Sequence, residues 1–324
     1  MSRRLEGVLP FWLDRPDLEA LDIATAARDA GLGGLWIGEM ATFDAVALAT
    51  AVGLRAPGIG LKVGPLAIGV RSPASIALGI SSVAELTGSE VEVALGASSP
   101  AIVSGWHDRE WEHRAAHAGE TVACLRAIFA GERSDYDGNY VQSHGFRLRH
   151  PLPGLQIAVA AFGAAMTRVA ARQADEVVMN LVPPDRVRAM RSNIDAEADA
   201  AGRPHPRLAV WVPVALDPGD AAFAQLAAQL AVYLAPPGYG DMFSELGFGG
   251  LVQRARGGAR RAELAPTIPA ELLAQVCALG TRREVTARVS EYHDAGADIV
   301  GVVPSTAEDP GGRRVLTALG AETG

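Results

Sequence analysis

The hydrophobic positions of this chain change period repeatedly, from helical spacing to short apolar runs and back. Apolar residues at 18, 21, 23, 24 and 27 fit a helix, and a glycine-rich segment at 31–34 ends that pattern. The next three residues, Leu-Trp-Ile at 35–37, form an apolar run typical of a buried strand. The Asp-Ala-Gly junction at 29–31 recurs at 294–296. The pattern therefore predicts a repeated helix–strand unit.

Eight apolar runs are predicted as strands, at 7–11, 35–38, 60–66, 91–95, 156–160, 176–180, 208–216 and 298–303. Helices are predicted between them, at about 17–30, 43–54, 73–86, 115–130, 163–173, 185–201, 218–235 and 282–294, with a last one at about 312–320. Apolar strands that alternate with amphipathic helices predict a parallel sheet covered on both faces. Eight such units favour an α/β fold closed into a (β/α)8 TIM barrel over an open doubly wound sheet.

Three segments break this rhythm and are predicted as insertions in a single barrel domain over residues 1–324. They are 97–113 after the fourth strand, 134–148, and the Gly- and Arg-rich segment 236–269 after the seventh strand. The second contains Asp-Gly-Asn at 137–139, a signal for a hairpin turn. Loops that follow strands build the active site of a barrel, so the first and third insertions are predicted to cover it.

Composition and charge narrow the class of protein. The 324 residues carry a formal net charge of −8 and have a mean hydropathy of +0.15. Negative charge argues against nucleic acid as the main partner, because binding a phosphate backbone needs a basic surface. No run reaches the roughly 18 apolar residues of a membrane span, and the N-terminus lacks the features of a signal peptide. Cys124 and Cys277 lie in helical patterns, so we expect no disulfide and a cytoplasmic protein.

Several kinds of catalytic chemistry lack their residues. Lys62 is the only lysine and lies early in a predicted strand, which disfavours Schiff-base chemistry. The phosphate-loop, zinc-protease, nucleophile-elbow and Cys-x-x-Cys motifs are all absent from the sequence. Gly58 and Gly60 precede a strand, whereas a dinucleotide fingerprint follows one. The His and acidic residues at 107–113 fit no standard zinc spacing, so no metal site is predicted.

Small and polar residues cluster at the ends of the predicted strands. They are Glu39 and Met40 after the second strand, Gly64 and Pro65 within the third, Ser98 and Ser99 after the fourth, Ala160 to Ala165 around the start of the fifth helix, and Asn180 at the end of the sixth strand. Small residues around Gly163 would leave backbone N–H groups free at a helix N-terminus, which suits an anion by geometry and dipole. Close packing is the structural alternative for each of them.

Short motifs in a fixed order make the chain resemble a known family. The motifs are Leu35-Trp36-Ile37-Gly38-Glu39, Leu66 through Arg71-Ser72-Pro73, Leu95 to Pro100 with Gly105-Trp106-His107, and Ala160 through Gly163 with Ala174 to Asn180. In order and spacing they resemble the bacterial luciferase-like monooxygenase superfamily. They resemble most its branch of oxidoreductases that depend on the deazaflavin coenzyme F420. The resemblance covers roughly residues 5–320.

The resemblance implies a barrel that holds a flavin-like ring at the C-terminal mouth of its strands, usually in a homodimer. It places the cofactor phosphate on the backbone amides of Gly163, Ala164 and Ala165. It also implies a cis peptide bulge in the third strand, which falls here on Gly64–Pro65, so we predict that this bond is cis. The cofactor-binding residues expected on this basis are Glu39, Met40, Gly64, Pro65, Ser98, Ser99, Ala160, Phe162, Gly163, Ala164, Ala165 and Asn180.

The chain departs from the family in its proton-transfer groups. Sugar-phosphate and alcohol dehydrogenases of the branch have an acid–His pair after the second strand, where this chain has Glu39 and Met40. They also have an acid after the fourth strand, near Ala101 of this chain. His107 therefore becomes the candidate for proton transfer, because imidazole titrates near neutral pH, and Glu39 could hydrogen-bond the ring. A surface histidine is the alternative.

Further side chains could shape the pocket. Phe11, Trp12 and Met40 could form the apolar wall that a planar ring requires, although core residues would look the same. Four arginines of the third insertion could grip an anionic substrate or cofactor tail, although an exposed lid is equally expected. They are Arg254, Arg256, Arg260 and Arg261.

Three functions remain open. The first is an F420-dependent oxidoreductase that moves a hydride between the deazaflavin and a small organic substrate, with the protein supplying orientation and a dry pocket. The second is a flavin monooxygenase of the same fold that uses reduced FMN and oxygen. The third, motivated by the missing His and acid, is a non-catalytic flavin- or deazaflavin-binding protein.

Overall fold

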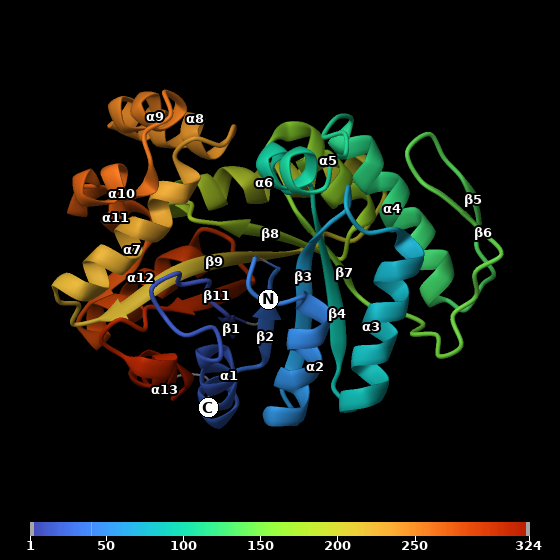
Figure 1. Cartoon of the computed structure of the whole chain (residues 1–324), viewed down its shortest axis with the longest axis horizontal. Coiled ribbons are helices and arrows are strands. Elements are labelled where there is room, and N and C mark those ends of the chain that lie inside the picture. Colours follow the sequence, from blue (N-terminus) through green and yellow to red (C-terminus); the bar gives the residue numbers. More distant parts are fainter. Residues whose placement is uncertain (1–2, 40, 322–324) are drawn as a thin grey trace.

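The structure is a computed structural model that describes residues 3–39 and 41–321 (Figure 1). Its main sheet contains the parallel strands β1 Arg4–Val8, β2 Gly34–Ile37, β3 Gly60–Ala67, β4 Val91–Gly96, β7 Ile157–Ala160, β8 Glu176–Asn180, β9 Arg207–Leu216 and β11 Ile299–Pro304. They pair in that order, and β11 pairs in turn with β1. The sheet therefore closes into an eight-stranded parallel barrel, which confirms the predicted TIM-barrel class.

Helices surround this barrel (Figure 1). They are α1 Glu19–Asp29, α2 Ala45–Arg55, α3 Pro73–Thr87, α4 Arg114–Phe129, α5 Ala164–Gln173, α6 Pro184–Ala200, α7 Asp220–Tyr233, α12 Arg282–Asp294 and α13 Arg313–Gly320. Local signals define several ends. Ser72 caps α3 by accepting from the Ser75 N–H, Pro73 opens the helix, and Gly88 ends it with a φ of 67°. These bounds lie within a few residues of the predicted ones.

The strands of the barrel are buried on both faces. Leu35 points outward to the helix layer, where its side chain lies over Gly7 beside Ala27 of α1. Trp36 points inward, and its ring meets the ring of Trp211 edge-on at 5.3 Å. Both Leu35 and Trp36 are fully buried. This double burial explains why the strands read as continuous apolar runs rather than as alternating ones.

Strand β3 contains the predicted irregularity. Its pairing with β4 shifts register between Val63 and Leu66, and the Gly64–Pro65 bond is cis, which confirms that prediction. Gly64 has a φ of 125°, and a Cβ there would lie 2.2 Å from the Ala94 carbonyl oxygen. Only glycine therefore fits at this close approach of two strands.

The segment 134–148 forms the predicted hairpin, with β5 Asp135–Asp137 antiparallel to β6 Gln142–His144. Glu120 of α4 holds its turn, because the carboxylate accepts from the N–H groups of Asn139, Tyr140 and Val141. Segment 97–113 contains a short π-helix, η1 Ala101–Trp106. The hairpin formed by β5 and β6 lies beside α4 (Figure 1).

Segment 236–269 follows α7 rather than β9 itself, and it is helical. It holds α8 Tyr239–Phe243, η2 Ser244–Phe248, α9 Gly249–Arg256, α10 Arg261–Leu264 and η3 Ala265–Thr267. Sequence reasoning missed the elements that come next, α11 Ala270–Val276 and β10 Ala278–Gly280. Strand β10 pairs with β9 at 214–216, beyond the residues that pair with β8.

The first strand differs from its prediction at 7–11, because it covers Arg4–Val8. Its register is set by pairing with β11 and β2, and Pro10 has no N–H to extend the ladder. As a result Phe11 lies in the loop at the barrel end instead of in a strand. Among the described residues no helix is long and apolar enough to cross a membrane.

Candidate active site

The C-terminal ends of the strands meet at one end of the barrel, here called the mouth. A Cβ on Gly96 of β4 would lie 3.0 Å from the Cβ of Pro65 and 3.7 Å from that of Ala160. A Cβ on Gly38 would lie 2.8 Å from the Phe11 ring and 3.9 Å from the Gly64 carbonyl oxygen. The ends of β2, β3, β4 and β7 thus form a continuous row of small residues, against which a flat molecule could lie.

The N-terminus of α5 opens beside this row. Gly163, Ala164 and Ala165 are exposed, and no side chain caps the helix. A Cβ on Gly163 would meet nothing within 4 Å. The first N–H groups of a helix have no partner within it, so they remain available to an anion. The geometry fits the cofactor phosphate that the resemblance implies at these three residues.

Three aromatic side chains pack at this helix end. Phe162 was expected from the sequence, whereas Tyr233 at the end of α7 and Tyr239 of the third insertion were missed. The Phe162 ring lies 4.5 Å from that of Tyr239, which lies 4.9 Å from that of Tyr233. Burial raises the pKa of both phenols, and the side chain of Asn180 at the end of β8 opposes that shift. The only sequence signal was an aromatic residue in the Pro- and Gly-rich turn at 236–240.

Glu39 is held by a cation that the sequence analysis did not single out. Its carboxylate forms an ion pair with Arg71, whose Nε donates to Oε2 at 3.3 Å. Arg71 also pairs with Asp44, which caps α2 by accepting from Val46 N–H. Hydrogen bonding to Glu39 and Asp44 raises the pKa of the Arg71 guanidinium despite its partial burial. Glu39 is therefore oriented by a charged network across the starts of α2 and α3.

His107 lies in an exposed part of the loop after β4. Its imidazole forms no hydrogen bond or ion pair with the residues that the structure describes, and Trp106 beside it is 56% exposed. The loop is anchored by Val103, which packs against Gly69, and by Ser99, whose carbonyl accepts from the Val103 N–H. The structure therefore presents His107 to solvent instead of holding it in the row of small residues.

The remaining predicted residues fall in different environments. Ser98 is exposed with a φ of 57°, at the turn from β4 into the loop. Phe11 is half-buried over Gly38, whereas Trp12 is only 6% exposed and donates from Nε1 to the Pro304 carbonyl. Trp12 is thus mainly a core residue. Met40 lies outside the described residues.

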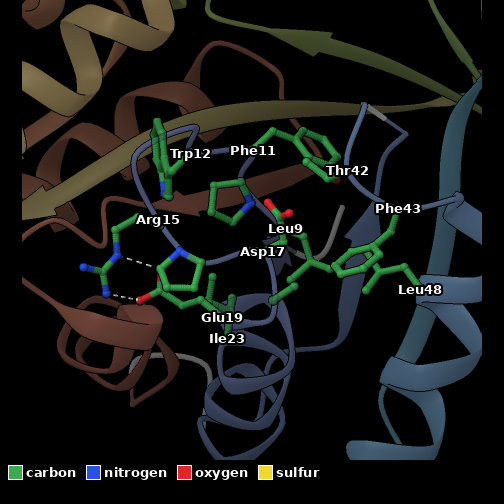
Figure 2. Close-up of a pocket in the computed structure, with 13 residues that line it drawn as sticks. Leu9, Phe11, Trp12, Arg15, Asp17, Glu19, Ile23, Thr42, Phe43 and Leu48 are labelled. Carbon is green, nitrogen blue, oxygen red and sulfur yellow. Dashed lines mark hydrogen bonds and ion pairs between the residues drawn. The ribbon is translucent and has the colours of Figure 1, made fainter.

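A small pocket lies behind the loop that carries Phe11 and Trp12 (Figure 2). Its volume is about 30 Å³, which is room for roughly one water molecule. Arg15 and Glu19 line it and form a two-point ion pair with each other. Glu19 also accepts from the Gly311 N–H and so ties this loop to the one after β11. The pocket is too small for a cofactor, and its polar groups support the structure.

Three of the four arginines predicted in the third insertion bind acceptors within that insertion. Arg256 pairs with Asp241 at 2.6 Å, and Arg260 with Glu263 at 2.6 Å. Arg254 donates to the Thr267 hydroxyl at 3.0 Å. These contacts stabilise the insertion. In the described part of the chain, no group of three or more His, Cys, Asp or Glu side chains is arranged to hold a metal ion.

Two methanopterin reductases are similar to this chain, one in sequence and one in structure. A 5,10-methylenetetrahydromethanopterin reductase of Methanolobus tindarius is 24% identical over 95% of this chain and 96% of its own. The F420-dependent tetrahydromethanopterin reductase of Methanopyrus kandleri has a similar structure, with a TM-score of 0.82 over 99% of this chain and 98% of that one, at 18% identity.

A monooxygenase has the same fold. The oxygenating constituent of 3,6-diketocamphane monooxygenase of Pseudomonas putida, solved with FMN, superposes with a TM-score of 0.71 over 99% of this chain and 98% of that one, at 17% identity. The luciferase-like monooxygenase family itself matches residues 16–298. A match over most of the chain, together with the closed barrel and its open mouth, shows that this chain belongs to the luciferase-like monooxygenase family.

Proposed function

We propose that this enzyme is an F420-dependent oxidoreductase that moves a hydride between the deazaflavin coenzyme F420 and a small organic substrate. The observation that carries the proposal is the open, uncapped N-terminus of α5 at the end of a row of small residues. Together they offer a flat platform and an anion site, which a phosphorylated ring cofactor needs. Two methanopterin reductases among the similar proteins, one described as F420-dependent, support this choice.

In this proposal the residues of the mouth bind and orient the cofactor. The backbone amides of Gly163, Ala164 and Ala165 would hold its phosphate, and Phe162 would separate that site from α8. Gly64, Pro65 and Ala160 would support the ring, with Ser98, Ser99 and Asn180 at its polar edges. The cofactor supplies the hydride chemistry, and the protein supplies orientation and exclusion of water.

Glu39 and His107 are proposed to have different roles beside the ring and the substrate. Glu39 is fixed by Arg71, so it would act as a charged hydrogen-bond acceptor for the ring or substrate. The His107 imidazole has no partner among the described residues, so it is available to exchange a proton with a bound substrate. That role requires the loop to bring His107 over the mouth. Loss of turnover in His107→Gln with unchanged cofactor affinity would support it, and unchanged turnover would exclude it.

The alternative is a monooxygenase that uses reduced FMN and oxygen. The FMN complex of the camphane monooxygenase constituent, with the same fold, favours keeping this candidate. An α5 N-terminus with uncapped amides would suit the FMN phosphate equally well. A non-catalytic binding protein would use the same platform without turnover.

We further propose a homodimer that forms through the outer face of α2 and α3. Leu54 of α2 and Leu78 and Leu86 of α3 are each more than half exposed. The helices α2 and α3 pack side by side, and apolar side chains gathered on one exposed face commonly mark an interface. Sedimentation of the double variant Leu78→Lys/Leu86→Lys is expected to give a monomer that still binds the cofactor. A variant that sediments like the native protein would place the interface elsewhere.

Residues 1–324 are proposed to form one barrel domain in the cytoplasm. Cys124 and Cys277 are both buried and free. Unpaired thiols are the rule in reducing compartments, where disulfides are rare. Recovery of the native protein in the soluble cytosolic fraction, with both thiols reduced, would support this location.

Equilibrium binding of F420 and of FMN, measured separately through fluorescence changes, tests the cofactor. Preference for F420 would support the reductase and justify a substrate screen under hydride-transfer conditions. Preference for FMN, followed by oxygen consumption with reduced flavin, would support the monooxygenase. Binding without turnover on any substrate would support the carrier, and binding of neither cofactor would overturn all three functions.

A further inference from the structure

The end of the barrel opposite the mouth, here called the floor, is filled by ionisable side chains. The cluster consists of Glu6 at the middle of β1 and of four residues in the first half of their strands, Lys62 of β3, Glu92 of β4, Glu176 of β8 and Arg207 of β9. Lys62 is the only lysine of the chain, and it is 5% exposed. Nothing in the proposed reaction uses this cluster.

Lys62 is the centre of the floor cluster. Its Nζ lies 2.9 Å from both carboxylate oxygens of Glu176, 3.1 Å from Glu6 Oε1 and 3.5 Å from Glu92 Oε2. Burial lowers the pKa of Lys62, but the three surrounding carboxylates outweigh that effect and raise it. The ammonium therefore stays charged throughout the neutral range.

Arg207 is the second cation. Its guanidinium donates to Glu92 Oε2 at 3.0 Å. Its Nε lies 2.9 Å from Glu176 Oε2 but forms no hydrogen bond, so the pairing with Glu176 is misaligned. Glu92 and Arg207 are partly exposed at the rim of the floor, whereas Glu176 is 0% exposed.

Two tryptophans separate the floor cluster from the mouth. Trp36 donates from Nε1 to Glu6 Oε2 at 2.7 Å, and the Lys62 ammonium lies 4.7 Å from the centre of its ring. The Trp211 ring packs edge-on against Trp36. The other three barrel strands, β2, β7 and β11, contain no ionisable residue. Strand β1 also begins with Arg4, which lies on the same face as Glu6 but is exposed at the outer end of the strand. The five charged groups are therefore the buried and partly buried ionisable residues of the described barrel strands.

The charges of this cluster do not balance when every group is ionised. Three carboxylates face two cations, which leaves one excess negative charge next to a fully buried carboxylate. An unbalanced buried charge is costly, and a carboxyl group in that position takes up a proton instead. We propose that the floor cluster holds one proton from the acid range up to about neutral pH, carried mainly by Glu176, and that the barrel loses stability as pH rises through this range.

The sign of the pH effect follows from the two states of Glu176. Burial raises the pKa of Glu176 to about 7 in the folded protein, even though the Lys62 ammonium opposes the shift, and the ordinary value is 4.5. Between these values the folded state binds the proton more tightly than the unfolded state. The stabilisation is therefore complete below the ordinary value and is lost as pH rises through about 7.

Urea unfolding across this pH window tests the proposal. In the native protein the unfolding equilibrium constant is expected to rise by close to tenfold per pH unit at its steepest, as for one linked proton. Glu176→Gln, which mimics the protonated carboxyl, should remove this component of the slope. Glu271→Gln, at an exposed carboxylate of α11, is the matched control and should keep the slope. A native protein whose stability is flat or rises here would overturn the proposal, as would an unchanged slope in Glu176→Gln.

The infrared C=O stretch of a protonated carboxylic acid gives a second, direct measurement on the native protein, which decides the question even where Glu176→Gln fails to fold. The band is expected about one unit below neutral pH, well above the range where an ordinary glutamate is protonated, and should disappear at alkaline pH. Its absence would mean that all three carboxylates are ionised, and the proposal would be wrong.

Discussion

The two ends of the barrel hold polar groups in opposite states. At the floor, five charged side chains approach one another within 2.9 to 3.5 Å and are largely shielded from water. At the mouth, the N–H groups that start α5 face solvent without a capping side chain, beside a row of small residues. The floor groups pair with one another within the chain, whereas the mouth has donors that a ligand can use.

This contrast separates a structural role from a binding role. Buried charges that pair with one another stabilise a particular arrangement. Removing one partner leaves the others buried without a counter-charge, which destabilises the fold. Donors left open at a helix start cost little in water and attract anions. A substitution at the floor should therefore change stability, and one at the mouth should change binding.

Lys62→Met should have the largest effect. It removes the cation that pairs with all three floor carboxylates, and loss of one member of a buried ion pair costs about 3–5 kcal/mol. Urea unfolding at neutral pH measures the loss, which should shrink at acid pH because the carboxyls take up protons. Lys62→Arg keeps the charge and is the control. A loss below about 1 kcal/mol, the level of a surface pair, would remove the contrast between the two ends.

Gly163→Asp should abolish cofactor binding without harming the fold. A Cβ at Gly163 meets nothing within 4 Å, and its backbone is already in a conformation typical of a capping residue. The new carboxylate would accept the N–H groups that a phosphate needs and repel it. We expect binding to weaken by at least about 100-fold, close to 2.7 kcal/mol, while thermal stability stays constant or rises.

Gly163→Asn is the uncharged control for that measurement, because it caps the helix without adding negative charge. It should weaken binding less than Gly163→Asp. Unaltered cofactor affinity in Gly163→Asp would show that α5 does not hold the phosphate.

Glu39→Gln tests a residue that lies at the mouth but forms an ion pair, as the floor residues do. The amide can still accept from Arg71, and Asp44 remains as a charged partner of that arginine. We expect a stability loss of about 1 kcal/mol, since the pair is only partly buried, and about a tenfold loss of cofactor affinity. Thermal unfolding and fluorescence binding measure the two effects. If stability changes and cofactor affinity does not, Glu39 has a structural role and not a binding role.

Arg256→Gln should have the smallest effect. Its ion pair with Asp241 lies on the exposed surface of the third insertion, where such pairs contribute about 0–1 kcal/mol. Cofactor affinity should stay within about twofold of the native value, because the guanidinium is used inside the insertion. A loss above tenfold would mean that the insertion grips the anionic part of the ligand and that the mouth extends to α9.

The sequence alone determined the elements whose signals are local. Eight apolar runs between amphipathic helices predicted the barrel, the helical pattern at about 73–86 predicted α3, and Asp-Gly-Asn marked the hairpin. The cis bond at Gly64–Pro65 was also predicted, through the family resemblance. Each of these features depends on residues close together in the chain, where spacing and backbone preference decide the outcome.

Only the tertiary structure decided which distant groups meet. Arg71 reaches Glu39 across 32 residues, and Lys62 reaches Glu176 across 114. No periodicity records such a pairing, because closure of the sheet brings the strands together. Strand β10 was missed for the same reason, since its three residues form a strand only against the exposed edge of β9. Tertiary contacts likewise left His107 at the surface and made Glu39 part of a charged network.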